Sequence, residues 1–225
     1  MDHELKSMWL KEGDSWNACD GGISWSKDYL RALAESVIRP GMVGFDTGCF
    51  TGSTASYVWP VFKAQGGHFY CVDWFKGNVN TIVGSFEWGK YPAETVLVQL
   101  LKNIEIGEGL DCVSVVVAES WRLAGIVADR AVDYVYIGGD HRYTHVKKDI
   151  VAWLPKIRPG GILCGHAFDK KIDLNSQESI KMAEEPEQDF YHSNGLHFGV
   201  TRAVQELLPG FEQGGEEIWA YRQPL

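Results

Sequence analysis

The chain has 225 residues, 45% of them hydrophobic, and a formal net charge of -9. That is enough for one domain with an ample core, and the negative charge argues against nucleic acid or an anionic membrane surface as the main partner. No apolar run approaches the roughly 20 residues of a membrane-spanning helix. Five cysteines without a CxxC pair, and a charged first segment without a secretory apolar region, predict a cytoplasmic protein.

Strand-like and helix-like segments alternate along the chain. Apolar runs predict strands at Val43–Thr47, His68–Asp73, Cys112–Val117, Tyr134–Gly138, Gly161–Cys164 and, at the sheet edge, Glu217–Arg222. Helices are predicted at Ser26–Ile38, Ser53–Ala64, Ala93–Ile104, Trp121–Val127 and Thr144–Leu154. Strands that alternate with helices imply crossover connections. The predicted fold class is therefore α/β: a doubly wound, mostly parallel sheet with helices on both faces and an antiparallel last strand.

A single domain is expected over residues 1–225, with residues 1–40 as an N-terminal helical cap. Two segments lack a regular pattern, Lys76–Pro92 and Asp169–Gly195. Both follow predicted strands, where doubly wound sheets bind their ligands, so both are candidate substrate lids. For the second, which is acidic, an ordinary surface loop is an equal alternative.

The stretch VGFDTGCFTGST, residues 43–54, carries the most information about a ligand. An apolar run ends at Asp46, and a turn punctuated by Gly48 and Gly52 leads into a helix. A glycine turn at a helix N-terminus lets a ligand approach the backbone amides. Because Asp46 would repel a pyrophosphate, the turn favours a nucleoside that carries an amino acid over a dinucleotide.

Acidic and polar residues also close the next predicted strands. Asp73 lies about 20 residues after the glycine turn, where it can accept hydrogen bonds from ribose hydroxyls or simply cap the following turn. Trp74, beside it, can lie against a base or in the core. At the end of the third strand, Glu119-Ser120 can bind a base edge, or Ser120 can be a helix N-cap.

A carboxylate and an imidazole, Asp140 and His141, follow the glycine pair at the end of the fourth predicted strand. Histidine suits proton removal because its pKa lies near neutrality. The next strand ends at His166, which either faces the same rim or hydrogen-bonds a neighbouring loop.

Taken in this order, the motifs resemble those of class I S-adenosylmethionine-dependent methyltransferases. DTGCFTGST is similar to the first motif of that family. DYVYIGGDHRYTHVKKDI and LPKIRPGGILCGHAF are similar to segments of its small-molecule O-methyltransferases, a subgroup that includes enzymes methylating sugar hydroxyls of macrolide antibiotics. The resemblance runs from about Ser26 to Leu208. It implies a seven-stranded Rossmann-like fold, S-adenosylmethionine as cofactor and S-adenosylhomocysteine as product.

The resemblance also implies roles for particular residues. Cofactor binding would fall to residues at the strand ends: Asp46, Gly48, Gly52, Asp73, Trp74, Glu119 and Ser120. Among these, the glycine turn would line the methionine part and Asp73 would hold the ribose. His141 would be the general base on the acceptor hydroxyl, with Asp140 beside it.

The chain departs from the family pattern at two positions. Where the family usually has a metal-binding aspartate after the fourth strand, this chain has Gly138, and where it often has an aspartate in GHD, this chain has Ala167. Neither residue brings the side-chain oxygen that Mg²⁺ requires. Asp140, His166 or Asp169 could substitute, although imidazole is a poor ligand for so hard a cation. We therefore expect no divalent metal site of the family type.

These features predict a metal-independent O-methyltransferase acting on a small hydroxylated molecule, such as a sugar or a glycosylated natural product. One alternative is a catalytically idle protein that binds S-adenosylmethionine. Another is a nicotinamide-dependent oxidoreductase, which the turn disfavours because Gly48-x-x-x-Gly52 lacks the G-x-G-x-x-G order. Nine tryptophans favour a homo-oligomer.

Overall fold

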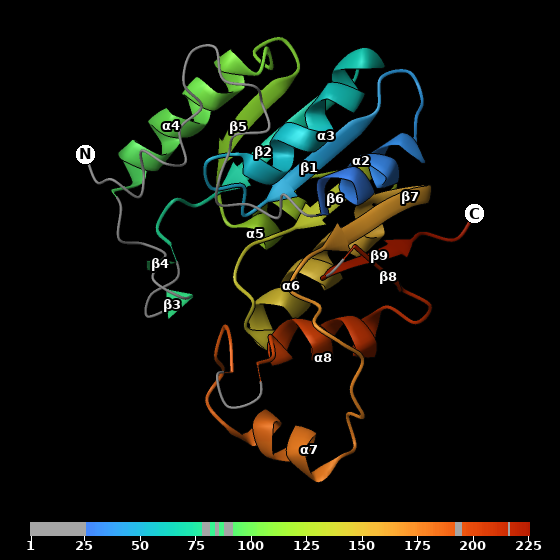
Figure 1. Cartoon of the computed structure of the whole chain (residues 1–225). Coiled ribbons are helices and arrows are strands. Elements are labelled where there is room, and N and C mark those ends of the chain that lie inside the picture. The colour runs from blue at the N-terminus through green and yellow to red at the C-terminus, as the bar shows by residue number, and fades with distance from the viewer. Residues whose placement is uncertain (1–25, 78–81, 84–85, 88–91, 192–194, 216) are drawn as a thin grey trace.

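Figure 1 shows the computed structural model, which describes residues 26–77, 82–83, 86–87, 92–191, 195–215 and 217–225. A seven-stranded sheet in the order β5-β2-β1-β6-β7-β9-β8 forms its centre, with helices on both faces. Its strands are β1 (Val43–Thr47), β2 (His68–Asp73), β5 (Val113–Val117), β6 (Val132–Ile137), β7 (Ile157–Gly165), β8 (Glu212–Gly214) and β9 (Ile218–Arg222). The strands from β5 to β7 pair in parallel, while β9 runs antiparallel to β7 and β8 antiparallel to β9. The predicted fold class is confirmed.

The helices are α2 (Lys27–Glu35), α3 (Ser53–Ala64), α4 (Ala93–Ile106), α5 (Ser120–Ala124), α6 (Tyr143–Trp153), α7 (Gln177–Glu184) and α8 (Phe198–Leu207). A 3₁₀ turn, Leu154–Lys156, joins α6 to β7, and a small hairpin pairs β3 (Ile82–Val83) with β4 (Phe86–Glu87). Of the expected N-terminal cap, residues 1–25 lie outside the described residues, as do most of 78–91. None of the helices in the described part of the chain is both long and apolar enough to cross a membrane.

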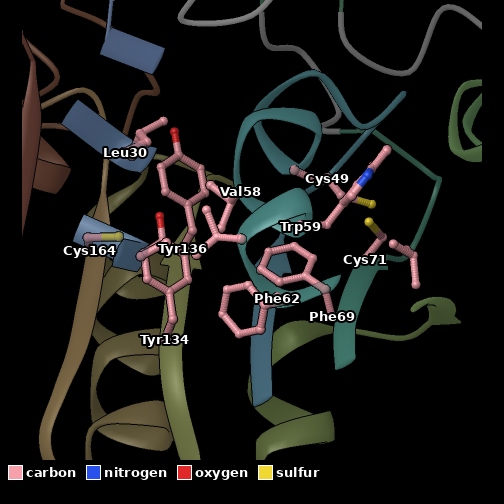
Figure 2. Packing of buried hydrophobic residues seen from close by; sticks show 14 of the residues in the cluster. Leu30, Cys49, Val58, Trp59, Phe62, Phe69, Cys71, Tyr134, Tyr136 and Cys164 are labelled. Carbon is pink, nitrogen blue, oxygen red and sulfur yellow. The ribbon is translucent and has the colours of Figure 1, made fainter. Parts of the chain in front are cut away.

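Two separate cores cover the two faces of the sheet. Along β6 every residue is buried, with Tyr134 and Tyr136 on one face and Val135 and Ile137 on the other. The first face packs against α2, α3 and α4, and the second against α5, α6 and α8. Figure 2 shows the first core, where Phe62 of α3 lies beside Phe69 of β2 and Tyr134. A strand buried on both faces explains the continuous apolar run that predicted it.

Besides the short β3–β4 hairpin and the 3₁₀ turn, the elements that escaped prediction are α7, α8 and β8. The side chains of α8 that are buried, among them Val200, Ala203 and Val204, do recur at helical spacing. By contrast, β8 is only three residues long, and its sequence, Glu-Gln-Gly, has no apolar residue. It forms because it pairs with β9. Such a strand depends on its partner and leaves no local signal.

A buried carboxylate holds the amino ends of the central strands together. Asp133, at the start of β6, is 3% exposed and accepts hydrogen bonds from Nε (2.6 Å) and Nη2 (2.8 Å) of Arg39. It also accepts one from the backbone N–H of Val43 (2.7 Å), and Nε of Arg158 lies 3.0 Å away. One carboxylate thus interacts with two guanidinium groups and with the backbone amide at the start of β1.

We expect Asp133→Ala to lower the free energy of unfolding by about 1.5–3 kcal/mol, because it removes the charge-assisted hydrogen bonds of Arg39 and leaves the N–H of Val43 without its acceptor. Asp129 provides a matched control, since its ion pair with Lys156 (2.6 Å) has an aspartate that is 68% exposed. Asp129→Ala should cost no more than about 1 kcal/mol. Urea unfolding of both variants checks this, and equal losses would contradict it.

Candidate active site

The glycine turn after β1 lies against the glycine pair after β6. Gly48 has a φ of +87°, a left-handed conformation that favours glycine, and its N–H donates to the carbonyl of Val72 (2.8 Å). A Cβ on Gly48 would lie 2.5 Å from both the Cα and the N of Gly139. Only a glycine therefore permits this backbone contact, which places the turn beside Asp140 and His141.

Gly52 has the same φ of +87° and is the N-cap residue of α3. A Cβ on Gly52 would lie 2.7 Å from the Leu100 side chain of α4. The two glycines that the sequence marked therefore serve different contacts, one with the β6 turn and one with a helix.

The carboxyl group of Asp46, in β1, is buried, and its surroundings disfavour its ionised form. It is 1% exposed, and neither of its oxygens has a hydrogen bond of standard geometry. Burial, with the charge of Asp73 as the second cause, raises its pKa to about 8, although the backbone N–H of Ala55 in α3 offsets part of this rise. A cationic ligand beside Asp46 would restore the charged form.

Asp73 joins the turns that follow β1 and β2. Its carboxylate accepts hydrogen bonds from the backbone N–H groups of Phe50 (2.9 Å) and Phe75 (2.7 Å). Burial raises its pKa, and the same backbone donors counteract the rise. The capping role considered from the sequence is therefore present, and each oxygen still has a lone pair for a hydroxyl donor. Trp74 is half-buried, with Nζ of Lys76 5.9 Å from its ring centre.

The Glu119-Ser120 pair lies where β5 leads into α5. Ser120 is the first residue of α5, and Glu119 occupies the N-cap position without a side-chain cap. Instead, the Ser120 hydroxyl accepts a hydrogen bond from the indole N–H of Trp153 in α6 (2.8 Å). Glu119 pairs with Arg122. The N-cap alternative for Ser120 is wrong, because its hydroxyl ties α5 to α6.

The carboxylate nearest the His141 ring is Asp189, not Asp140. Oδ1 of Asp189 lies 3.2 Å from Nδ1 of His141 and accepts a hydrogen bond from the His141 backbone N–H (3.2 Å). Asp140 instead accepts hydrogen bonds from Nε (3.0 Å) and Nη2 (2.5 Å) of Arg142. Burial tends to raise the pKa of Asp189, but the interaction with His141 holds it below its usual range. The expected carboxylate–imidazole pair thus forms with a different carboxylate.

Sequence reasoning missed Asp189 because it lies 48 residues from His141 in the irregular segment 169–195. An acidic run was visible there, but nothing local distinguishes Asp189 from its neighbours. His197, the N-cap residue of α8, was also missed; its ring centre lies 5.1 Å from that of His141. His166, which was considered, faces the same place, with its ring centre 4.7 Å from that of His141.

A metal site of the family type does not fit this chain. A Cβ on Gly138 would lie 2.6 Å from the Tyr136 ring, so a carboxylate there would meet an occupied space. Ala167 is 1% exposed and has a φ of +60°. Neither side chain supplies an oxygen ligand, and at Gly138 the Tyr136 ring leaves no room for a larger side chain.

The sequence matches a known protein family over more than half of its length. A family model described as a methyltransferase domain matches residues 45–168, more than half of the chain. The chain belongs to this methyltransferase family. The match begins inside β1 and ends after β7, so it covers the glycine turn, Asp73, His141 and His166. None of the curated proteins matches the chain.

Solved structures, O-methyltransferases among them, share the fold. A protein from Corynebacterium glutamicum has a TM-score of 0.59 at 13% identity, covering 89% of this chain and 81% of its own. An O-methyltransferase from Bacillus cereus, solved with S-adenosylhomocysteine, has a TM-score of 0.56 at 14% identity, covering 91% and 83%. A TDP-rhamnose 3'-O-methyltransferase of calicheamicin biosynthesis has 0.51 at 14%, covering 88% and 78%. At these identities the likeness establishes the Rossmann-like methyltransferase fold.

For this methyltransferase, the buried carboxyl group of Asp46 predicts a pH-dependent effect of Asp46→Asn. The pKa rises on folding from about 3.9 to about 8. The contribution of Asp46 to stability is therefore fully present below pH about 4 and is lost as the pH rises toward 8.

Asp46→Asn removes this loss, so its stability relative to wild type should increase by up to about 1.4 kcal/mol per pH unit between pH 5 and 7. Urea unfolding of both ligand-free proteins at the two pH values measures the difference. A difference that does not change with pH would contradict the proposed burial of this charge.

Proposed function

We propose that this methyltransferase transfers the methyl group of S-adenosylmethionine to a hydroxyl of a small molecule, with His141 as general base. The observation that carries the proposal is the backbone contact between Gly48 and Gly139. Through it, the turn that would hold the cofactor and the segment that carries a buried imidazole share one edge of the sheet. The family match supports methyl transfer, and the O-methyltransferases among the structures of the same fold support a hydroxyl acceptor.

Each cofactor group meets a residue of suitable chemistry in this proposal. The ammonium group of the methionine part would neutralise Asp46, whose pKa burial now raises to about 8. The ribose hydroxyls would donate to the free lone pairs of Asp73. The adenine would lie toward the start of α5, near Glu119 and Ser120, with Trp74 alongside. Gly48 and Gly52 would let the cofactor approach the turn backbone.

The transfer step needs little from the protein besides positioning and one base. The acceptor oxygen attacks the sulfonium methyl in line, the methyl–sulfur bond breaks as the methyl–oxygen bond forms, and the hydroxyl proton passes to His141. The products are a methyl ether and S-adenosylhomocysteine. Asp189 would orient the imidazole and stabilise its protonated form, as carboxylates do for histidine bases elsewhere. Asp140 would act on the same segment indirectly, by holding Arg142.

A sugar or glycosylated molecule is the acceptor class that we favour. The TDP-rhamnose 3'-O-methyltransferase of the same fold supports this choice. Segment 169–195 would form one wall of the acceptor pocket, because it delivers Asp189 to His141. The missing family aspartates favour a second candidate, an idle protein that binds S-adenosylmethionine without turnover.

Calorimetric titration of metal-stripped protein tests the cofactor. We expect micromolar binding of S-adenosylmethionine and S-adenosylhomocysteine, and Asp73→Ala should weaken it by roughly 10- to 100-fold because a charge-assisted hydrogen bond is lost. Asp111→Ala is the control, since Asp111 is 67% exposed and pairs with Lys63 at the opposite end of α3. Absence of binding by both nucleosides would refute the proposal.

The base is tested by the rate of S-adenosylhomocysteine formation in the presence of a chelator, over a panel of nucleotide sugars and O-glycosides. With an accepted substrate, His141→Gln should lower kcat by roughly 10²- to 10⁴-fold, the usual contribution of a general base, and leave S-adenosylhomocysteine affinity unchanged. His68→Gln, at the amino end of β2, should retain full activity. Undiminished turnover in His141→Gln would exclude His141 as base, and a lack of turnover over the whole panel would favour the idle protein.

A further inference from the structure

Ionisable side chains gather around His141. They come from four separate stretches of chain: His141, His166, Asp169, Asp189 and His197. Three are imidazoles and two are carboxylates. Methyl transfer as proposed uses only His141 and Asp189, so the other residues call for a separate explanation.

Three of these side chains converge as metal ligands do. His141, Asp189 and His197 each offer one ligand atom, and these atoms all lie within 4.8 Å of one another. A tetrahedral zinc ion with bonds of about 2.0–2.1 Å needs its ligand atoms about 3.3 Å apart. Side-chain rotations that draw the atoms together by about 1.5 Å would therefore bring all three within bonding distance of one ion and leave its fourth position open.

The polar atoms at this point lack ordinary hydrogen-bond partners. Both ring nitrogens of His141 and Oδ2 of Asp189 are buried without a hydrogen bond of standard geometry, and so is Nδ1 of His166. The side chain of His141 is 15% exposed and that of Asp189 only 6%. Burying polar atoms without partners costs free energy. One cation at the centre would satisfy the imidazoles and the carboxylate together.

A second carboxylate, that of Asp169, orients the imidazole of His197 toward such a cation. Asp169 accepts a hydrogen bond from the backbone N–H of His197 (2.6 Å), and both its oxygens lie 3.2 Å from Nδ1 of the same residue. With Nδ1 engaged, Nε2 is the nitrogen left to bind a metal. A carboxylate behind a ligating histidine is the usual outer-shell arrangement of zinc sites.

The backbone fixes the distance between the two histidines. A Cβ on Gly199 would lie 2.3 Å from the carbonyl oxygen of His141 and 2.4 Å from the N of Tyr143. Because glycine alone permits this approach, the first turn of α8 rests directly on the His141 segment. His197, the N-cap residue of α8, and His141 therefore lie on two segments whose backbones are in direct contact.

We propose that His141, Asp189 and His197 bind a divalent transition-metal ion of the zinc type. Two imidazoles and one carboxylate suit Zn²⁺ and its neighbours in the first row, and they suit Mg²⁺ poorly. His166 stands next to the site as a further nitrogen donor. The proposal does not depend on methyl transfer. A metal held by His141 and Asp189 would replace the direct contact between them, so the metal-bound and metal-free proteins use these two residues differently.

The test is a titration of tag-free, metal-stripped, full-length protein with Zn²⁺, followed by calorimetry without S-adenosylmethionine or acceptor. We expect one ion per chain, bound at micromolar concentration or tighter. Asp189→Asn and His197→Gln should each weaken binding by more than about 100-fold, and Asp169→Asn by roughly 10- to 100-fold as an outer-shell change. The control, His68→Gln, changes a histidine whose Nε2 is 2.9 Å from Ser114 at the far end of β2 and should bind as wild type does.

Co²⁺ supplies a second readout that needs no variant, in case a substitution unfolds the protein. Visible absorption typical of a low-coordinate nitrogen and oxygen shell is expected in the wild type. An intense ultraviolet charge-transfer band would indicate a cysteine ligand and overturn the assignment. Absence of Zn²⁺ binding by the wild type, or equal binding by the folded Asp189→Asn and His197→Gln proteins, would also overturn it. Since no cofactor is present, none of these outcomes depends on the methyltransferase activity.

Discussion

The backbone contact between Gly48 and the glycine pair at 138–139 is the constraint on which the site depends. Parallel strands bring β1 and β6 side by side, but side chains would normally keep the following turns apart. With glycine on both sides, the turns touch, and a single Cβ at Gly48 would lie 2.5 Å from its neighbour. A similar close contact between two backbones occurs at Gly199, where α8 packs on the His141 segment. Close backbone approach, more than any side-chain bond, assembles this edge of the sheet.

A buried aspartate at each edge of the sheet has different partners. At the amino edge, Asp133 is surrounded by two arginines and a strand amide, so its charge is compensated within the protein. At the carboxyl edge, none of the described residues forms an ion pair with Asp46, and burial raises its pKa to about 8. The first arrangement stabilises the fold. The second costs stability wherever Asp46 ionises and leaves a carboxyl group that a cationic ligand would hold in its charged form, which is the expected trade-off between stability and function.

The architecture and the cofactor side of the site could be predicted from sequence because their signals are local. Buried parallel strands appear as apolar runs, and a glycine turn between a strand and a helix is visible within twelve residues of sequence. The acceptor side could not be predicted in the same way. Asp189 and His197 lie 48 and 56 residues after His141 in the sequence and meet it only through the tertiary fold, and neither lies in a distinctive local pattern. Asp140, adjacent to His141 in sequence, turns instead to Arg142, since neighbouring side chains in a turn need not face each other.

We propose that the cofactor and the imidazole of His141 meet where the two glycine turns touch. A crystal structure with S-adenosylhomocysteine would test this most directly, because the anomalous signal of the sulfur locates the reacting end of the cofactor. We predict that the homocysteine part lies along the Gly48–Gly52 turn with its amino group near Asp46, and that the sulfur faces His141. A nucleoside bound away from this turn, or a sulfur facing the opposite side from His141, would contradict the account.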